Sequence, residues 1–279
     1  MKVLLLGGSG FVGRHLATAL RARGTTVEAA SLRDLPGAAS AAASCDVVVN
    51  LAGEPIAQRW NAQVKRRIEE SRVELPQRFL DALTHYPRRT SAYVSASAIG
   101  YYGTSDGATF DEASPPGSDF LARVCVAWER EAARASDLGL RVAIVRAGVV
   151  LGTDGGALQR MLPPFRAGLG GVIGSGHQWL SWIHARDLTG IFLLAIDGAG
   201  GALNACAPNP VTNAQFTQAL GAALHRPAVL PTPTFALRMM LGEGADMLLH
   251  GQRVLPRRTQ ELGYRFEFPE LTGALANLL

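Results

Sequence analysis

The sequence predicts an α/β fold: a doubly wound parallel sheet, followed by a smaller mixed α/β region in the C-terminal part of the chain. Short apolar runs of strand length recur along the first 150 residues, at 2–6, 46–50, 92–95 and 142–150. Segments with apolar residues at helical spacing separate these runs, which is the order that parallel strands require. The 279 residues, 48% of them hydrophobic and 18% charged, are enough to bury a large core.

A glycine-rich turn follows the first apolar run. Residues 7–13 are Gly-Gly-Ser-Gly-Phe-Val-Gly, and residues 14–23 carry apolar side chains at helical spacing. Glycines let the main chain turn sharply and let a pyrophosphate come close, while the N-terminus of the following helix offers free N–H groups to phosphate oxygens. Because strand, turn and helix occur together, the segment predicts a Rossmann-type dinucleotide site rather than an ordinary glycine-rich turn.

The next strand is expected after Gly24 and ends at Ser31 and Arg33. An NAD site usually has an acidic residue at this strand end, where it accepts hydrogen bonds from the adenosine ribose. Glu28 is near the expected position but falls inside the strand. A hydroxyl and a guanidinium at the tip suit a 2′-phosphate, so the sequence favours NADP over NAD. The alternative is that Arg33 is a solvated side chain at a strand end.

Small or hydroxyl-bearing residues follow two later strands. Leu51-Ala52-Gly53 comes directly after the strand at 46–50, and the segment 95–103 contains two serines and two tyrosines. Ligands bind at the carboxyl ends of parallel strands, so both segments are candidates for the site. The interval between Arg33 and the strand at 46–50 holds one brief helix, so a strand that commonly occurs there is expected to be missing.

The alternation of strands and helices weakens beyond Gly152, which marks a candidate domain boundary. We expect residues 1–152 to form an NADP-binding domain to which 179–197 returns. Residues 153–178 and 198–279 are then expected to form the substrate-side region.

Composition argues against several classes of partner. The net charge of +4 comes from scattered basic clusters without interleaved aromatic residues, so no nucleic acid partner is expected. No apolar run is long enough to cross a membrane, and the opening run is too short for a signal peptide. Cys45, Cys125 and Cys206 lack metal-ligand spacing, so we expect reduced thiols and no metal. The protein is expected to be soluble and cytoplasmic.

Six motifs together carry a resemblance to a known family: GGSGFVG, NLAGEP, SASAIGYYG, RAGVVL, SWIHARD and GQRVLP. The chain resembles the extended, or atypical, short-chain dehydrogenase/reductases over essentially its whole length. More narrowly, it is similar to their epimerase-like branch of NADP-binding proteins, which carries a C-terminal domain of unknown function. The resemblance implies a Rossmann domain and a small-molecule substrate, an unidentified carbonyl or sugar-nucleotide-like compound.

The resemblance also places the cofactor on particular residues. Those expected to bind NADP are Gly7, Gly10, Phe11, Val12, Gly13, Ser31, Arg33, Leu51, Ala52, Gly53, Ser95 and Arg146. Either Ser97 or its neighbour Ser95 would hydrogen-bond a substrate carbonyl or carbinol.

The chain departs from the family at the pair that usually moves the proton. Relatives have a Tyr followed four residues later by a Lys on the helix after the long loop, and these positions fall on Leu121 and Cys125. Leucine has no proton to give, and a buried cysteine is neutral. The usual acid/base pair is therefore absent.

Three functional hypotheses remain. In the first, a reductase or epimerase uses Tyr101 or Tyr102 as acid/base with Ser97 as partner, although packing or cofactor stacking would equally explain the two tyrosines. In the second, a redox enzyme takes its proton from water or from a loop residue, with Glu54, Asp111 and His184 as candidates. In the third, the protein is a non-catalytic NADP-binding sensor or regulatory module.

Long helical regions are expected at 61–86, where Pro76 should break or kink the helix, and at 118–136. Relatives often pair through the corresponding helices, so the resemblance allows a homodimer.

Overall fold

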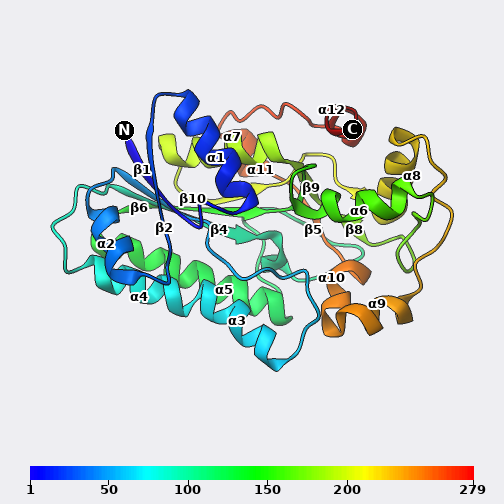
Figure 1. Ribbon diagram of the computed structural model, residues 1–279, viewed down its shortest axis with the longest axis horizontal. Coiled ribbons are helices and arrows are strands. Elements are labelled where there is room, and N and C mark those ends of the chain that lie inside the picture. The colour runs from blue at the N-terminus through cyan, green and yellow to red at the C-terminus, as the bar shows by residue number, and fades with distance from the viewer.

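The computed structural model describes all residues, 1–279, and its centre is a six-stranded parallel sheet with helices on both faces (Figure 1). The strand order is β10-β6-β4-β3-β1-β2. The strands are β1 (Lys2–Leu6), β2 (Thr26–Ala30), β3 (Val47–Asn50), β4 (Ala92–Ala98), β6 (Arg141–Ala147) and β10 (Gly201–Ala205). This doubly wound architecture confirms the predicted fold class.

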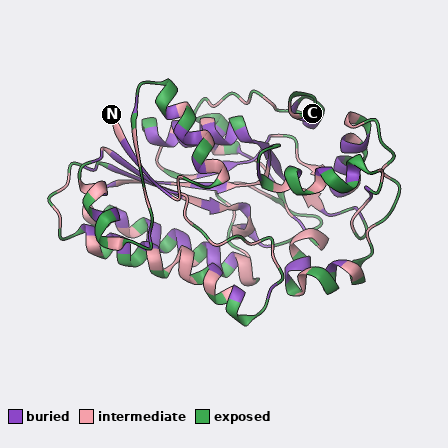
Figure 2. Cartoon of the chain, in the orientation of Figure 1, coloured by how far each residue is buried: buried purple, intermediate pink, exposed green.

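The helices form two layers. On one face α1 (Phe11–Ala22) and α7 (Ala185–Asp197) pack on the sheet, and on the other α2 (Leu35–Ala43), α4 (Glu74–Leu83) and α5 (Phe120–Ala133) do so. Buried residues run through the sheet and the inner faces of these helices, while the outer helix faces are exposed (Figure 2). Strands covered on both sides need apolar residues on both sides, which explains the continuous apolar runs in β1 and β3.

The long helical region at 61–86 is divided. Helix α3 (Ala62–Arg72) ends at Arg72, Val73 caps it, and α4 begins at Glu74. Pro76 lies in the first turn of α4, where the missing N–H has no helical partner to lose. The predicted break in the helical region is therefore present, and it lies between α3 and α4, just before Pro76.

The sheet lacks a strand beyond β2, as the short interval after Arg33 predicted. Helix α2 leads directly from β2 to β3, so β2 is an edge strand that pairs only with β1. The carboxyl end of β2 is consequently not covered by a further strand.

The smaller C-terminal region lies at one end of the sheet (Figure 1) and is mixed α/β, as expected. Its own core contains Leu162, Phe165, Trp182, Phe216 and Leu220 among other buried residues. Its helices are α6 (Gly156–Arg166), α8 (Asn213–Ala223), α9 (Thr234–Leu241), α10 (Asp246–Leu249), α11 (Arg257–Glu261) and α12 (Leu271–Leu278). Three two-stranded sheets pair β11 (Val211–Thr212) with β8 (Trp179–Leu180), β12 (Arg253–Val254) with β5 (Thr109–Phe110), and β7 (Val149–Leu151) with β9 (Trp182–His184).

One part of the expected domain division differs from the structure. Residues 198–279 were expected on the substrate side, but β10 lies within this range and pairs with β6 as the edge strand of the main sheet. Leu203 and Ala205 are fully buried there. The prediction was wrong for this strand because Asn204 and the turn residues after it made the segment look like a connector.

Asp187, in the first turn of α7, ties the C-terminal segment to the sheet domain. Its carboxylate accepts hydrogen bonds from the Tyr264 hydroxyl and from the main-chain N–H groups of Glu267 and Phe268, at 3.0, 2.8 and 3.0 Å. This buried clamp fixes the chain before α12. No helix in the structure is both long and apolar enough to span a bilayer.

Candidate functional site

Three glycines shape the turn between β1 and α1, each in a different way. Gly7 has φ +81°, and a Cβ on it would lie 2.8 Å from the Ala52 nitrogen. A Cβ on Gly13 would lie 2.7 Å from main-chain atoms of the turn, so only glycine lets α1 pack against it. A Cβ on Gly10 would meet only the Gly7 oxygen, at 3.3 Å. Gly10 therefore leaves its side-chain space free for a ligand.

The N-terminus of α1 is open. The N-cap residue is Gly10, which has no side chain to accept a hydrogen bond from the first N–H groups of the helix, and the first turn contains no acidic residue. The N–H groups at the start of the helix, including those of Phe11 and Val12, thus lack the partners that a capped helix would have. A bare main-chain turn below an uncapped helix N-terminus fits a diphosphate, which needs close main-chain approach and N–H donors.

The Phe11 side chain has a packing role in addition. A Cβ on Gly152 would lie 2.4 Å from an atom of the Phe11 ring, and a Cβ on Gly155 would lie 2.3 Å from one. The segment after β7 therefore needs glycine at the two positions where it passes the Phe11 ring. Phe11 thus holds the segment 152–156 beside the glycine turn.

The tip of β2 presents an unpaired cation, as predicted. Ser31 and Arg33 are both exposed; the Ser31 hydroxyl accepts from the Arg33 N–H at 3.2 Å, and the Arg33 guanidinium contacts no carboxylate. Glu28 instead pairs with Lys2 at 2.8 Å. The tip lies beside the glycine turn, because the Gly7 N–H donates to Ala30 O at 3.4 Å. The arrangement suits a 2′-phosphate better than a ribose diol.

The segment after β3 forms the opposite wall of the turn. Leu51, Ala52 and Gly53 run past Gly7, and the Ala52 N–H donates to Oδ1 of Asn50 at 3.1 Å. This bond holds the main chain where it passes the turn. The expected clustering of the glycine turn, the β2 tip and the β3 end is therefore found in the structure.

A buried hydrogen-bonded network lies at the end of β4. The Ser97 hydroxyl donates to Oε1 of Glu129 at 2.7 Å, and the Arg146 guanidinium forms two bonds to the same carboxylate, at 2.8 and 2.7 Å. Arg146 also donates to the Tyr102 hydroxyl at 2.9 Å, and that hydroxyl donates to Oδ1 of Asn204 at 2.7 Å. The network joins α5 to three neighbouring strands of the sheet, β4, β6 and β10.

This network changes the expected roles of two residues. Arg146, expected to bind the cofactor, is 4% exposed and uses all three of its side-chain nitrogens inside the protein. Ser95 is 1% exposed, and its hydroxyl donates to the Ala96 carbonyl. Side chains alternate between the two faces of a strand, and both of these point into the layer between the sheet and α5. Their hydrogen-bond donors are used inside the protein and are not available to a cofactor.

The two tyrosines are placed differently. The Tyr102 ring is almost fully buried, and burial raises the pKa of its phenol well above the ordinary value. Tyr101 is half-buried, its hydroxyl has no partner in the protein, and its ring centroid lies 3.6 Å from the Arg146 guanidinium carbon. This cation–π contact fixes the Tyr101 ring while leaving its hydroxyl free.

Leu121 and Cys125, the positions assigned from the sequence to the usual Tyr and Lys, lie beside Gly100. A Cβ on Gly100 would be 3.5 Å from Cβ of Leu121 and 3.9 Å from Sγ of Cys125. Burial raises the pKa of the Cys125 thiol to about 12, so the thiol is neutral. Neither a leucine side chain nor a neutral thiol can act as general acid or base, so these two positions supply no acid/base pair.

The loop residues considered as proton donors lie in other settings. Glu54 accepts from Gln58 and Arg67, and Asp111 pairs with Arg257 at 3.0 Å. His184 is buried against Phe268, with ring centroids 4.0 Å apart, and caps α7. All three are engaged in structural contacts.

Glu129 and Asn204 were not among the expected site residues. Glu129 follows Leu121 and Cys125 at intervals of four along α5, so all three share one helix face. That spacing could have identified Glu129 from the sequence. Asn204 had no such signal, because its role depends on β10 joining the sheet.

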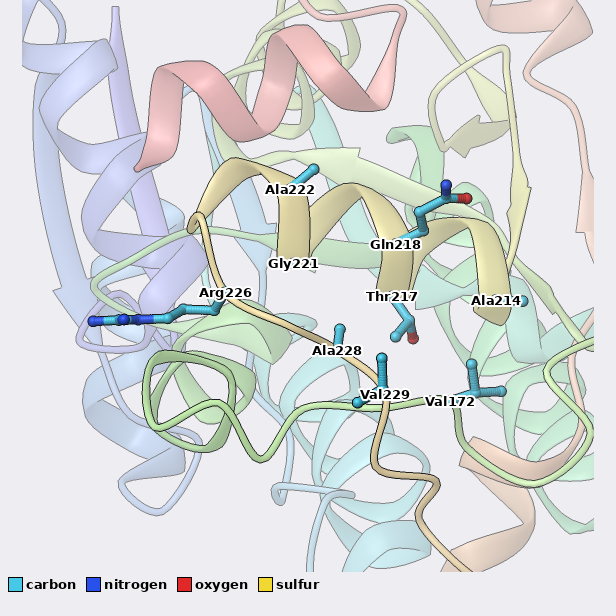
Figure 3. Close-up of a pocket in the computed structure, with 9 residues that line it drawn as sticks. All are labelled: Val172, Ala214, Thr217, Gln218, Gly221, Ala222, Arg226, Ala228 and Val229. Atoms are coloured by element: carbon cyan, nitrogen blue, oxygen red, sulfur yellow. The ribbon is translucent and has the colours of Figure 1, made fainter.

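Two hollows in the structure are lined by residues outside the glycine turn. One, of about 230 Å³, lies between α8 and the segment that follows it, and Figure 3 shows Thr217, Gly221 and Val229 among its lining residues. The other lies between α1 and α7 and is lined by Arg14, Asp154 and other residues. Neither includes a residue expected to bind the cofactor or to act in catalysis.

Comparisons with known proteins agree with this geometry. Residues 3–206 match the NAD dependent epimerase/dehydratase family, and residues 232–278 match a domain of unknown function, DUF1731. Epimerase family protein SDR39U1 of Homo sapiens is 44% identical over 293 residues, covering 100% of both chains. Epimerase family protein YfhF of Bacillus subtilis is 35% identical over 298 residues, covering 100% of this chain and 98% of its own.

Solved structures show the same relationship. A crystal structure of human SDR39U1 (isoform 2) with NADPH superposes with a TM-score of 0.93 at 42% identity, covering 100% of this chain and 99% of that one. UDP-glucose 4-epimerase of Thermus thermophilus, in complex with NAD, shares the fold at a TM-score of 0.81 and 19% identity, covering 100% of this chain and 97% of that one. With a family match across most of the chain and relatives aligned over its whole length, the protein belongs to the NAD dependent epimerase/dehydratase family.

Proposed function

We propose that the protein is an NADP-dependent oxidoreductase or epimerase that acts on a small carbonyl or sugar-nucleotide-like substrate. The observation that carries this proposal is the bare glycine turn beneath the uncapped N-terminus of α1, with the unpaired Arg33 beside it. The human relative crystallised with NADPH supports the same cofactor. The substrate class follows from the family and not from a residue that selects it.

Different residues of the chain bind different parts of NADP. Gly7 and Gly10 admit the diphosphate to the main chain, and the first N–H groups of α1 donate to it. Ser31 and Arg33 take the adenosine 2′-phosphate, and the main chain of 51–53 lies along the other half of the cofactor. When bound, NADP supplies a hydride donor or acceptor.

Tyr101 is the best-placed proton donor among the expected catalytic residues. Its hydroxyl is free and its ring is fixed by Arg146. Ser97 is buried and its hydroxyl donates a hydrogen bond to Glu129, and the Tyr102 hydroxyl accepts from Arg146 and donates to Asn204. Ser97 and Tyr102 therefore position the site, while Tyr101 is the group that could reach a substrate.

The proposal is tested with two mixtures: NADPH with a panel of aldehydes and ketones, and NADP+ with a panel of alcohols and sugar nucleotides. The near-ultraviolet absorbance of NADPH reports net reduction or oxidation, and analysis of the products reports epimers, whose formation returns the hydride to the substrate. We expect turnover with one member, a large loss in Tyr101→Phe, and unchanged NADPH affinity in that variant. Tyr102→Phe is the matched control for loss of a phenol, and its effect should appear mainly in stability. A cofactor that binds but gives neither a change in NADPH absorbance nor an epimerised product with any substrate would favour the non-catalytic binding module instead.

A further inference from the structure

Arg72, the last residue of α3, points back toward the segment that follows β3. Its Nη2 lies 3.0 Å from the position of a Cβ on Gly53, so a larger residue at 53 would displace the guanidinium. Nη1 makes two long bonds of 3.3 Å, to Ile68 O and the Ser71 hydroxyl. The Ser71 hydroxyl also accepts from the Glu54 N–H at 2.9 Å, which fixes the segment relative to α3.

The Arg72 guanidinium forms no ion pair within the protein. None of its nitrogens contacts a carboxylate, and Nε and Nη2 have no hydrogen-bond acceptor. The nearby Glu54 is already bonded to Gln58 and Arg67. Arg72 is partly buried, and this burial lowers the pKa of its guanidinium. A half-buried cation without an ion-pair partner is costly, so an oxygen-rich ligand at this place would relieve the cost.

The position of Arg72 is set from the opposite side by α5. Its guanidinium carbon lies 5.2 Å from the centroid of the Trp128 ring, one helical turn from Cys125. Cys125 cannot offer a positive charge there, because its side chain is a neutral thiol. Arg72 is therefore the cation held between the segment 51–53 and α5.

We propose that Arg72 binds the nicotinamide-side half of NADP, through the oxygens of its ribose and phosphate. This inference rests on the proposed function, because it requires NADP along the segment 51–53. Two arginines then hold the two ends of the cofactor: Arg33 at the adenosine 2′-phosphate and Arg72 beyond the glycine turn. Gly53 serves this arrangement by leaving room for the guanidinium.

Binding of two ligands by calorimetry tests the assignment. NADPH spans both ends, whereas adenosine 2′,5′-bisphosphate contains only the adenosine end. We expect Arg72→Gln to weaken NADPH binding about tenfold or more and to leave the bisphosphate unchanged, since a charge-assisted hydrogen bond is lost only with NADPH. Arg33→Ala should weaken both ligands. Arg66→Gln, an exposed arginine on the same helix without an ion pair, should change neither.

The outcomes separate the two proposals. Failure of the unmodified protein to bind NADPH would overturn the proposed function. Normal NADPH binding by the unmodified protein and by Arg72→Gln, or an equal loss for both ligands in that variant, would overturn the role of Arg72. If Arg72→Gln does not fold, Arg72→Met decides: it keeps an unbranched stem against Trp128 but has neither a charge nor a hydrogen-bond donor. A selective loss of NADPH affinity in Arg72→Met supports the proposal, and unchanged affinity for both ligands overturns it.

Discussion

The hydroxyl of Ser97 donates to Oε1 of Glu129 over 2.7 Å, and this bond joins the end of β4 to the helix face that carries Leu121 and Cys125. The same carboxylate holds the buried Arg146 guanidinium through two bonds. This helix face carries an apolar side chain, a neutral thiol and a carboxylate that is locked into an ion pair. The ion pair fixes the Arg146 guanidinium, which in turn lies against the Tyr101 ring.

Glu129→Gln should therefore act on stability. The substitution keeps the shape of the side chain but leaves the Arg146 charge buried and unpaired, so we expect the free energy of unfolding to fall by about 3–5 kcal/mol. Urea denaturation followed by circular dichroism measures the change. Glu131→Gln is the matched control on the same helix. Glu131 pairs with Arg130 and Arg134, and both arginines are at least partly exposed, so we expect a loss of about 1 kcal/mol or less. Equal losses in the two variants would contradict the structural importance of the Arg146 pair.

Substitutions at two glycines of the turn should have different effects, one on the stability of the fold and the other on NADPH binding. Gly13→Ala places a Cβ 2.7 Å from main-chain atoms, so we expect a loss of stability of about 1–3 kcal/mol from overpacking. Gly10→Val meets only one main-chain oxygen, at 3.3 Å, and should cost about 1 kcal/mol as a poorer N-cap while abolishing NADPH binding, since the side chain fills the space of the diphosphate. Thermal unfolding and calorimetric titration with NADPH check the two effects. Unchanged NADPH affinity in Gly10→Val would show that the diphosphate does not bind at this turn.

The cofactor half of the site could be predicted from the sequence because its signals are local. The spacing of Gly7, Gly10 and Gly13 between a strand and a helix fixes the turn, and the tip residues of β2 follow at a known distance along the chain. In an open parallel sheet the carboxyl ends of adjacent strands lie together, so the segment after β3 could be assigned to the same site.

The catalytic half depended on non-local packing and was predicted less well. Both Tyr101 and Tyr102 lie in a short 3₁₀ helix, and no local pattern determines which of them turns inward. The sequence predicted that Arg146 binds the cofactor. The face of α5 that packs against β6 carries Glu129, and the ion pair between Glu129 and Arg146 leaves the Arg146 charge unavailable to a cofactor. Asn204 completes the network only because β10 joins the sheet, which the turn-rich sequence around it did not indicate.

Arg33 should determine the choice between the two dinucleotides. Its guanidinium is exposed and unpaired, so removing it disturbs no ion pair. We expect Arg33→Ala to weaken NADPH binding about tenfold to a hundredfold, as the loss of a charge-assisted bond to phosphate implies, and to change NADH binding little. Calorimetric titration with each dinucleotide measures the ratio, with Arg66→Ala as the control for net charge. Equal losses for NADPH and NADH would mean that Arg33 does not contact the 2′-phosphate.

His184 should make the stability of the protein depend on pH. It is buried and stacked on Phe268, and burial lowers its pKa from 6.5 to about 4, although the neighbouring Asp187 opposes the shift and Arg186 reinforces it. The folded protein thus favours the neutral imidazole, and the unfolded chain binds more protons between these two pKa values. The stabilisation is complete above pH 6.5 and is lost as the pH falls toward about 4. The maximal loss attributable to this one residue is about 3 kcal/mol.

His184→Asn isolates this contribution from that of the carboxylates, which also titrate near the lower limit. Asparagine can keep the N-cap of α7 by accepting from the Arg186 N–H, but it does not titrate and cannot stack on Phe268. The variant should be less stable than the unmodified protein at neutral pH. The difference between the two unfolding free energies, measured by urea denaturation at several pH values, should then shrink as the pH falls from 6.5 toward about 4. A difference that stays constant across this range would mean that the buried imidazole takes up its proton as readily as a solvated one.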